Sequence, residues 1–187
     1  MDAFSYLSVL LSIVLGLGLT QILTASGRII RHRDRVRLDW LPLLWGAMLL
    51  VVYVQAWWAM FGLRGVRQWT FVGFITVLAE TATLYLMAVV VLPEQIDEAG
   101  IDLAGYYDTH HKWLFGCFLA TLVVSVAKDV VIGGRLPELT NLVFHGVLAL
   151  SCIVGMTVPR RRVQEIVGVA SAGTVAVYIA LLFTRLR

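Results

Sequence analysis

The chain has 187 residues, of which 59% are hydrophobic and 14% are charged, and its mean hydropathy is +0.85. Soluble domains usually have about 45–50% apolar and about 25% charged residues, so this composition excludes an ordinary soluble domain. The net charge of +3 does not indicate a nucleic-acid partner, because the basic residues lie in short segments between apolar runs, where membrane topology accounts for them.

Six apolar runs follow one another along the chain, and each is long enough for a membrane-spanning helix, which needs about 20 residues. We predict spans at residues 3–25, 41–62, 69–92, 113–132, 138–157 and 163–184. They leave almost nothing for a soluble part. We therefore expect one all-α domain over residues 1–187, a polytopic integral membrane protein in the form of a six-helix bundle.

Each half of the chain holds three predicted spans, so the two halves must run in opposite directions through the membrane. This is the arrangement of transporters built from inverted repeats. The halves show no convincing sequence similarity to each other. The span count therefore allows a bundle of 3+3 inverted halves without requiring it.

Arginines are concentrated in two of the connections between spans. Residues 27–40 contain five of them and residues 159–165 contain three. These segments fall on the same side when the first and last pairs of spans form hairpins, and the positive-inside rule makes that side cytoplasmic. The N-terminal residues carry Asp2 and no basic residue before the first apolar run, which is untypical of a signal peptide. We expect a multi-pass protein of the inner (plasma) membrane with both termini outside the cytoplasm.

Small residues recur at helical spacing in the first and last spans. They are Ser8, Ser12, Gly16 and Thr20 in the first span and Gly168, Ala172 and Ala176 in the last. Such stripes let membrane helices approach closely. They predict helix packing, either within the chain or between copies in a homo-oligomer. The alternative is a pore or groove lined by these faces.

The third span, FVGFITVLAETATLYLMAVVVLP (71–93), is apolar except for a carboxylate near its centre, Glu80. Thr76 and Thr83 share a helical face with Glu80, so this face should point into the bundle rather than at lipid. A charge at mid-bilayer costs about 2.5–3.5 kcal/mol on insertion scales, and such residues usually face a cavity or a partner. Two alternatives follow: Glu80 is a proton or cation site, or it is an acid whose hydrogen bonds tie helices together.

Polar residues of other spans lie at depths compatible with Glu80. They are Gln55 in the second span, Lys128 and Asp129 in the fourth, Asn141 and His145 in the fifth, and Tyr178 in the sixth. We predict that they form, together with Thr76 and Thr83 of the third span, a polar, outward-facing vestibule and solute path with Glu80 at its floor. Each of these residues also has a structural alternative. Lys128 and Asp129 could extend to the membrane–water interface at the end of their helix. The other side chains could form hydrogen bonds that tie helices together.

Motifs for catalysis, cofactors and metals are weak. The sequence has no HExxH, glycine-rich phosphate loop or CxxC motif. Its four histidines are divided between the two sides, with His145 alone in the outer half, which argues against a haem held by two histidines. Cys117 and Cys152 both fall in the cytoplasmic half of their helices, so no disulfide is expected. We expect no cofactor and no metal site.

These patterns favour a small channel or transporter for a proton, an ion or a small solute, with the vestibule as its path. A first alternative is a non-transporting membrane subunit or sensor that docks a cytoplasmic partner through the acidic segment 93–112 and the arginine-rich segment 27–40. A second is an intramembrane enzyme that acts on a lipid or quinone with Glu80 and His145 as acid and base. The lipid bilayer is the partner that the composition itself implies.

Overall fold

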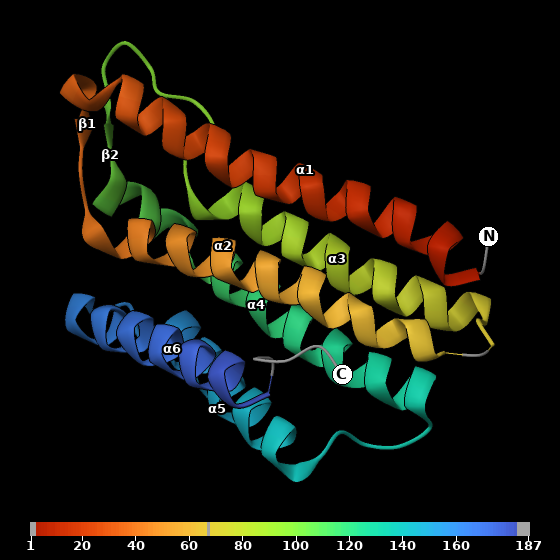
Figure 1. Ribbon diagram of the computed structural model, residues 1–187. Helices are drawn as coiled ribbons and strands as arrows, with labels where there is room; N and C mark the ends of the chain where they lie inside the picture. Colours follow the sequence, from red (N-terminus) through yellow and green to blue (C-terminus); the bar gives the residue numbers. More distant parts are fainter. Residues whose placement is uncertain (1–2, 67, 183–187) are drawn as a thin grey trace.

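The computed structural model describes residues 3–66 and 68–182. The long helices in this part of the chain are α1 (Ala3–Arg31), α2 (Trp40–Ala59), α3 (Phe71–Val91), α4 (Leu103–Gly133), α5 (Leu139–Thr157) and α6 (Arg161–Leu182) (Figure 1). All six are long and apolar enough to cross a membrane. The predicted all-α bundle of six spans is therefore confirmed. Residues 183–184 of the last predicted span lie outside the described residues.

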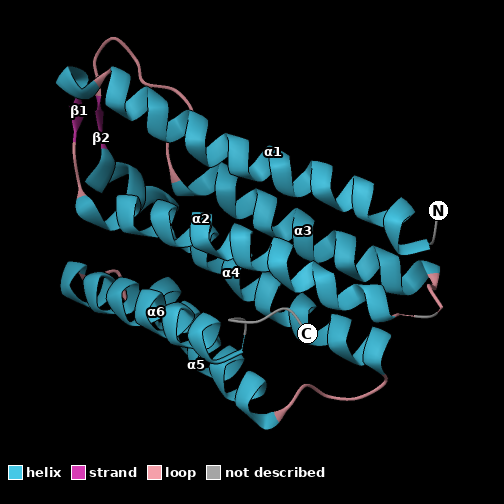
Figure 2. Ribbon diagram, viewed as in Figure 1, coloured by secondary structure: helices cyan, strands magenta, loops and turns pink. Residues whose placement is uncertain are grey.

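Short elements connect the long helices at the two ends of the bundle. They are two 3-10 helices, η1 (Arg33–Arg35) and η2 (Met60–Gly65), and two strands, β1 (Val36–Arg37) and β2 (Ile101–Asp102) (Figure 2). The strands pair in parallel. We call the end that carries η1, β1 and β2 the arginine-rich end, and the end that carries η2 and the α4–α5 connection the far end.

The six helices pack in a closed ring. α3 lies between α1 and α4, α5 lies between α4 and α6, and α2 lies between α6 and α1. α2 also contacts α3 and α4. The halves pack differently from each other, because α1 packs mainly on the third helix of its half whereas α4 packs on the second helix of its half. The packing of the described helices thus adds no support for two inverted halves.

α4 begins closer to the arginine-rich end than the sequence suggested. The Asp102 side chain accepts a hydrogen bond from the Ala104 N–H at 3.1 Å, which satisfies a backbone donor in the first turn. The first turns then bury Tyr107 and His111 on one face, which stabilises them against the bundle. The segment 93–112, expected to be a loop, is therefore non-helical only up to β2 and helical from Leu103 onward.

Aromatic side chains fill the interior toward the arginine-rich end. Trp45 of α2 is 1% exposed and meets two rings of α4 edge to face, with centroid distances of 5.1 Å to Phe115 and 6.2 Å to Phe118. Gly155 of α5 lies against Phe115, and a Cβ at this position would be 2.4 Å from the ring. We call the rings of Trp45, Phe115 and Phe118 the aromatic layer. Helices α2, α4 and α5 are close-packed at this layer, and the interior space of the bundle lies between the layer and the far end.

α1 packs on the bundle through a face that differs from its stripe of small residues. The buried residues of α1 are Leu11, Leu15, Gly18, Ile22, Ala25 and Ile29. Gly16 and Thr20 are not among them, and Ser8 and Ser12 donate to backbone carbonyls of α1 itself. A Cβ at Gly16 would meet no described atom within 4 Å. Gly16 and Thr20 of the stripe are therefore exposed among the described residues, and packing between copies stays a prediction.

α6 makes one close approach through a glycine. Gly168 is buried against α2, and a Cβ there would lie 2.7 Å from Leu41 Cδ1. Ala172 is half-buried and Ala176 is exposed, so the stripe turns away from the bundle toward the far end. Close contact through the stripe of α6 is thus confined to its part nearer the arginine-rich end.

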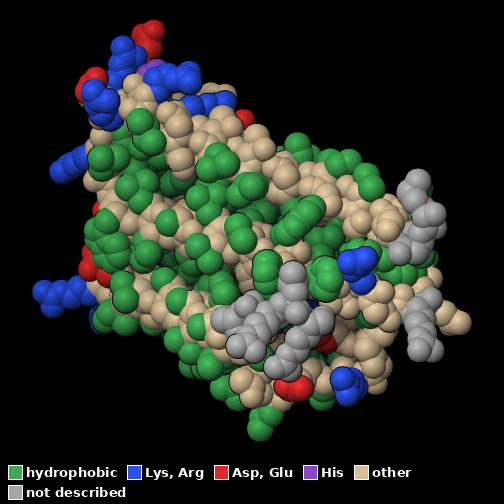
Figure 3. Space-filling view, viewed as in Figure 1, with side chains coloured by type: hydrophobic (Ala, Val, Ile, Leu, Met, Phe, Trp, Pro, Cys, Tyr) green, Lys and Arg blue, Asp and Glu red, His purple; other side chains and the backbone are tan. Residues whose placement is uncertain are grey.

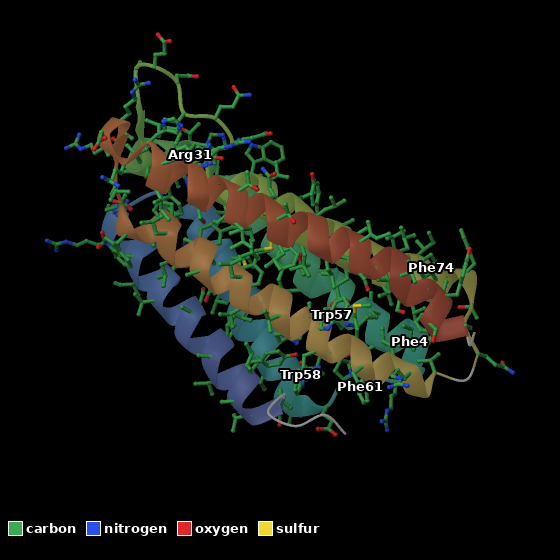
Figure 4. All side chains as sticks on the ribbon, turned by 45° about the horizontal axis from the view of Figure 1, so that its top comes forward. Phe4, Arg31, Trp57, Trp58, Phe61 and Phe74 are labelled. Atoms are coloured by element: carbon green, nitrogen blue, oxygen red, sulfur yellow. The ribbon has the colours of Figure 1, made fainter. Side chains whose placement is uncertain are left out.

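The surface has the distribution expected of a protein in a bilayer. Figure 3 shows hydrophobic side chains across the middle of the face in view, with Lys and Arg gathered mainly at the arginine-rich end. Trp57, Trp58 and Phe61 are exposed toward the far end, away from Arg31 (Figure 4). Aromatic side chains are enriched where a membrane meets water. These features agree with a multi-span membrane protein.

Candidate functional site

An interior cavity of about 340 Å³ lies between the aromatic layer and the far end. All six long helices and η2 contribute to its wall. Its lining includes seven of the residues predicted for the vestibule: Gln55, Glu80, Lys128, Asp129, Asn141, His145 and Tyr178. Much of the remaining wall is apolar, with Leu15, Val77 and Phe118 among its members. The fold thus gathers side chains that are distant in the sequence around one space.

Glu80 and Lys128 form an ion pair at this cavity. Lys128 Nζ donates to both carboxylate oxygens of Glu80, at 3.0 Å and 2.8 Å, and each side chain is 17% exposed. α3 and α4 pack side by side, and the Thr121 hydroxyl of α4 donates to the Thr83 hydroxyl of α3 at 3.0 Å on the same interface. Lys128 therefore points inward onto Glu80, and the two hydrogen bonds of this ion pair join α4 to α3.

Asp129 adds a second carboxylate to the cavity wall. It is half-buried and interacts electrostatically with Lys128, Glu80 and His145. Within residues 3–66 and 68–182, its carboxylate makes neither a hydrogen bond nor an ion pair. Because the charges of Glu80 and Lys128 offset each other, an ionised Asp129 gives the lining an excess negative charge when the imidazole is neutral.

His145 is held in a defined orientation on α5. Its Nδ1 lies 2.9 Å from the Asn141 carbonyl oxygen, which can only accept, so Nδ1 carries a proton and donates. The Tyr178 hydroxyl of α6 donates to Asn141 Oδ1 at 3.1 Å, and the Tyr178 and His145 rings are 6.0 Å apart. In the neutral imidazole, Nε2 is then the acceptor. These contacts join α5 and α6 beside the cavity.

The two threonines predicted for the path have other roles. The Thr76 hydroxyl donates to the Val72 carbonyl at 2.8 Å, within α3. The Thr83 hydroxyl donates to the Glu80 carbonyl at 2.9 Å and accepts from Thr121. Neither contributes to the cavity wall. Both share a helical face with Glu80, but their hydroxyls satisfy backbone and interhelical bonds.

A second hollow lies next to the cavity at the far end. It has a volume of about 460 Å³ and lies among η2, the last turns of α4 and the α4–α5 connection. Its lining shares Gly62, Leu63, Lys128, Asp129 and Asn141 with the cavity. The two spaces therefore adjoin, and we call this second hollow the mouth. Residues 60–62 of η2, which forms one side of the mouth, were predicted as the end of the second span, and residues 63–65 as part of the connection that follows it.

A hydrogen-bond network that the sequence patterns did not predict joins three helices near the arginine-rich end. The Tyr107 hydroxyl of α4 donates to Gln164 Oε1 of α6 at 2.8 Å. Gln164 Nε2 in turn donates to the carbonyls of Gly155 at 2.8 Å and Val158 at 2.7 Å, where α5 ends. Gln164 stands at the start of the last predicted span and within the arginine-rich segment 159–165, and no role was predicted for it. Its spacing of four residues from Gly168 is a signal that could have placed it on the buried face of α6.

An ion-pair network lies beside these hydrogen bonds. Arg161, the first residue of α6, contacts Asp39 at 2.7 Å and Glu165 at 2.9 Å. Asp39 also accepts from the Leu41 N–H at 2.9 Å and so caps α2. Together with the hydrogen bonds of Gln164, these bonds connect α2, α4, α5 and α6. They lie between the aromatic layer and the arginine-rich end.

The two segments considered for partner docking contact each other. β1 pairs with β2 through Val36 opposite Ile101 and Arg37 opposite Asp102. An Arg28 side-chain N–H donates to the Glu94 carbonyl oxygen. Gly100 has a φ of +82°, and a Cβ there would be 2.3 Å from the carbonyl oxygen preceding β1, so a glycine is required. Part of both segments is therefore engaged within the chain.

Comparison of the chain with protein-family models, with curated proteins and with solved structures finds no match. The class of the protein therefore follows from its own fold and site. The chain is a multi-span membrane protein whose helices enclose, near one end, a cavity lined by both charged and apolar side chains.

Proposed function

We propose that this protein is a small transporter and that its solute binds in the cavity beside Glu80 and Lys128. The observation that carries the proposal is the ion pair itself, at 2.8 Å, on the wall of a cavity of about 340 Å³ inside a membrane bundle. Ionisable residues inside membrane proteins are costly and usually mark the path of a substrate or ion. Polar side chains of α2, α5 and α6 converge on the same space, which favours a binding site.

A transporter fits the arrangement better than an open channel. The cavity adjoins the far end through the mouth, whereas Trp45, Phe115 and Phe118 are buried between it and the arginine-rich end. A bundle open to one side and packed on the other corresponds to one state of alternating access. In this proposal the positive-inside rule sets the orientation, so the arginine-rich end is cytoplasmic and the mouth faces outward.

The geometry favours transport over the two alternatives. Lys128 occupies both oxygens of Glu80, which leaves this carboxylate poorly placed as an acid or base opposite His145. The β1–β2 pairing occupies backbone groups of the two segments that a cytoplasmic partner would use. A non-transporting subunit would have no need of a cavity with an ion pair on its wall.

Uptake into liposomes tests the proposal. The purified full chain is reconstituted, and entry of radiolabelled choline, gluconate and mannitol is compared with entry into protein-free liposomes. We expect at least one probe to enter faster with the protein present. Ser125→Trp, which fills the cavity from α4, should abolish that entry. Val123→Trp, on the exposed face of the same helix, should leave it unchanged.

Two results would contradict transport through this cavity. One is entry of all three probes at the rate of protein-free liposomes. The other is faster entry that Ser125→Trp leaves intact, because the solute would then bypass the cavity.

A further inference from the structure

We infer that the solute is a small organic cation, an ammonium group on an apolar body, and that Asp129 is its counter-charge. This inference rests on the proposed function and concerns the same cavity. It follows from three features of the cavity: the carboxylate of Asp129, which has no charged partner bonded to it, the apolar part of the wall, and the volume of about 340 Å³.

One carboxylate of the lining lacks a paired charge. Lys128 bonds both oxygens of Glu80, so these two residues offer a ligand little net charge. Asp129 lies beside them, half-buried, with no hydrogen bond or ion pair to any described residue. A carboxylate in a membrane cavity is costly unless a cation offsets it. The cavity therefore attracts positive charge and disfavours anions.

The composition of the wall argues against a bare metal ion as the cation. Within residues 3–66 and 68–182, no group of three or more His, Cys, Asp or Glu side chains is arranged to hold a metal. Leu15, Val77, Leu84 and Phe118 face the same space and offer no ligand atoms. Hard cations bind through several oxygen ligands. The apolar wall instead suits the hydrocarbon part of an organic ion.

The size of the cavity and the remaining polar groups agree with such a solute. A volume of about 340 Å³ falls in the range of roughly 300–1,000 Å³ typical of small-molecule sites. An ammonium group donates several hydrogen bonds. The Asp129 carboxylate and, in the neutral ring, His145 Nε2 are acceptors on the wall, and the Gln55 amide supplies a further oxygen.

Binding to the purified full chain in detergent tests the inference without transport. Three probes share a four-carbon body and differ in charge: n-butylammonium, n-butanol and n-butyrate, at pH 8 and equal ionic strength. We expect n-butylammonium alone to raise the unfolding temperature in a saturable manner, and to slow modification of a cysteine introduced as Ser125→Cys.

Variants at Asp129 assign the effect to this residue. Asp129→Asn should weaken n-butylammonium binding by about tenfold or more, as expected for loss of a charged hydrogen-bonding partner. Asp129→Glu keeps the charge and should retain binding, and Asp108→Asn, an exposed acid elsewhere on α4, should behave as the parent. If Asp129→Asn fails to fold, protection of the Ser125→Cys thiol by n-butylammonium but not by n-butyrate or n-butanol tests the preference for a cation.

Several outcomes would overturn the inference. They are equal responses to n-butylammonium and n-butyrate, no response to any probe, and binding that Asp129→Asn leaves intact. Failure of the inference is separable from failure of transport. Entry of gluconate or mannitol alone would contradict the cation and support transport, whereas n-butylammonium binding without entry of any probe would support the site and contradict transport.

Discussion

Glu80 and Lys128 are charged residues whose stability inside the bundle depends on each other. Both are 17% exposed, and Lys128 Nζ lies within 3.0 Å of both oxygens of Glu80. Removing one partner of a buried pair typically costs about 3–5 kcal/mol, whereas replacing both by apolar residues is often neutral. The pair is therefore expected to be stable as a unit and unstable when either residue stands alone.

Single and double variants should reveal this dependence. We expect Glu80→Gln and Lys128→Met each to lower the free energy of unfolding by about 2–4 kcal/mol, because each leaves the opposite charge unpaired. The double variant should lose clearly less than the sum of the two. Unfolding of the full chain by SDS in mixed micelles measures these differences, with Asp108→Asn as a control that should change little. Additive losses would contradict a direct interaction.

At the scale of residues, helical periodicity and depth predicted most of the polar side chains that line the cavity, because a helix fixes the face and depth of each Cα. Glu80, His145 and Asn141 were found in this way. The inward direction of Lys128 was not predictable, because a long lysine side chain near a helix end can reach either the interface or the interior. Thr76 shares the face of Glu80, yet its hydroxyl bonds within α3.

At the scale of elements, glycines decide how closely certain helices approach. Gly155 of α5 lies against the Phe115 ring, which is itself packed on Trp45. A Cβ at Gly146 of the same helix would meet no described atom of another element within 4 Å. The same substitution should therefore have opposite effects at the two positions.

Alanine substitutions on α5 test this packing. Gly155→Ala should lower the unfolding temperature, with a loss of about 1–3 kcal/mol, because the added methyl group overpacks the aromatic layer. Gly146→Ala should be neutral or stabilising by up to about 1 kcal/mol, because alanine favours the helix over glycine. Thermal unfolding in detergent compares the two variants. A tolerated Gly155→Ala would show that α5 does not approach α4 this closely.

Element boundaries were less predictable than the elements themselves. The six helices followed from apolar runs of sufficient length, but the start of α4 at Leu103 did not, because the acidic residues around it resemble a solvated loop. The N-cap at Asp102 and the burial of Tyr107 identify it as helix. The buried role of Gln164 was hidden in the same way by the arginines that precede it.

At the scale of the whole molecule, the bundle is a ring of helices whose interior is packed with side chains toward one end and encloses a cavity toward the other. Toward the arginine-rich end, the aromatic layer and the bonds of Gln164 and Arg161 hold the helices together. Toward the far end, the ring encloses the cavity and its mouth. The order of helices around the ring depends on many side-chain contacts between distant segments, so the sequence of one chain did not predict it.

The most direct test of an outward-facing, water-filled cavity is the reaction of a cysteine at position 125 with a small, membrane-impermeant thiosulfonate in intact cells. Ser125 lines the cavity, whereas Val123 is on the exposed surface of the same helix. We predict that Ser125→Cys reacts from outside the cell. Val123→Cys, which faces lipid, should remain unmodified, and Arg33→Cys should react only after permeabilisation. The native cysteines set the background. A Ser125→Cys thiol that stays unmodified in both intact and permeabilised cells would contradict a water-filled cavity, and modification only after permeabilisation would contradict an outward-facing mouth.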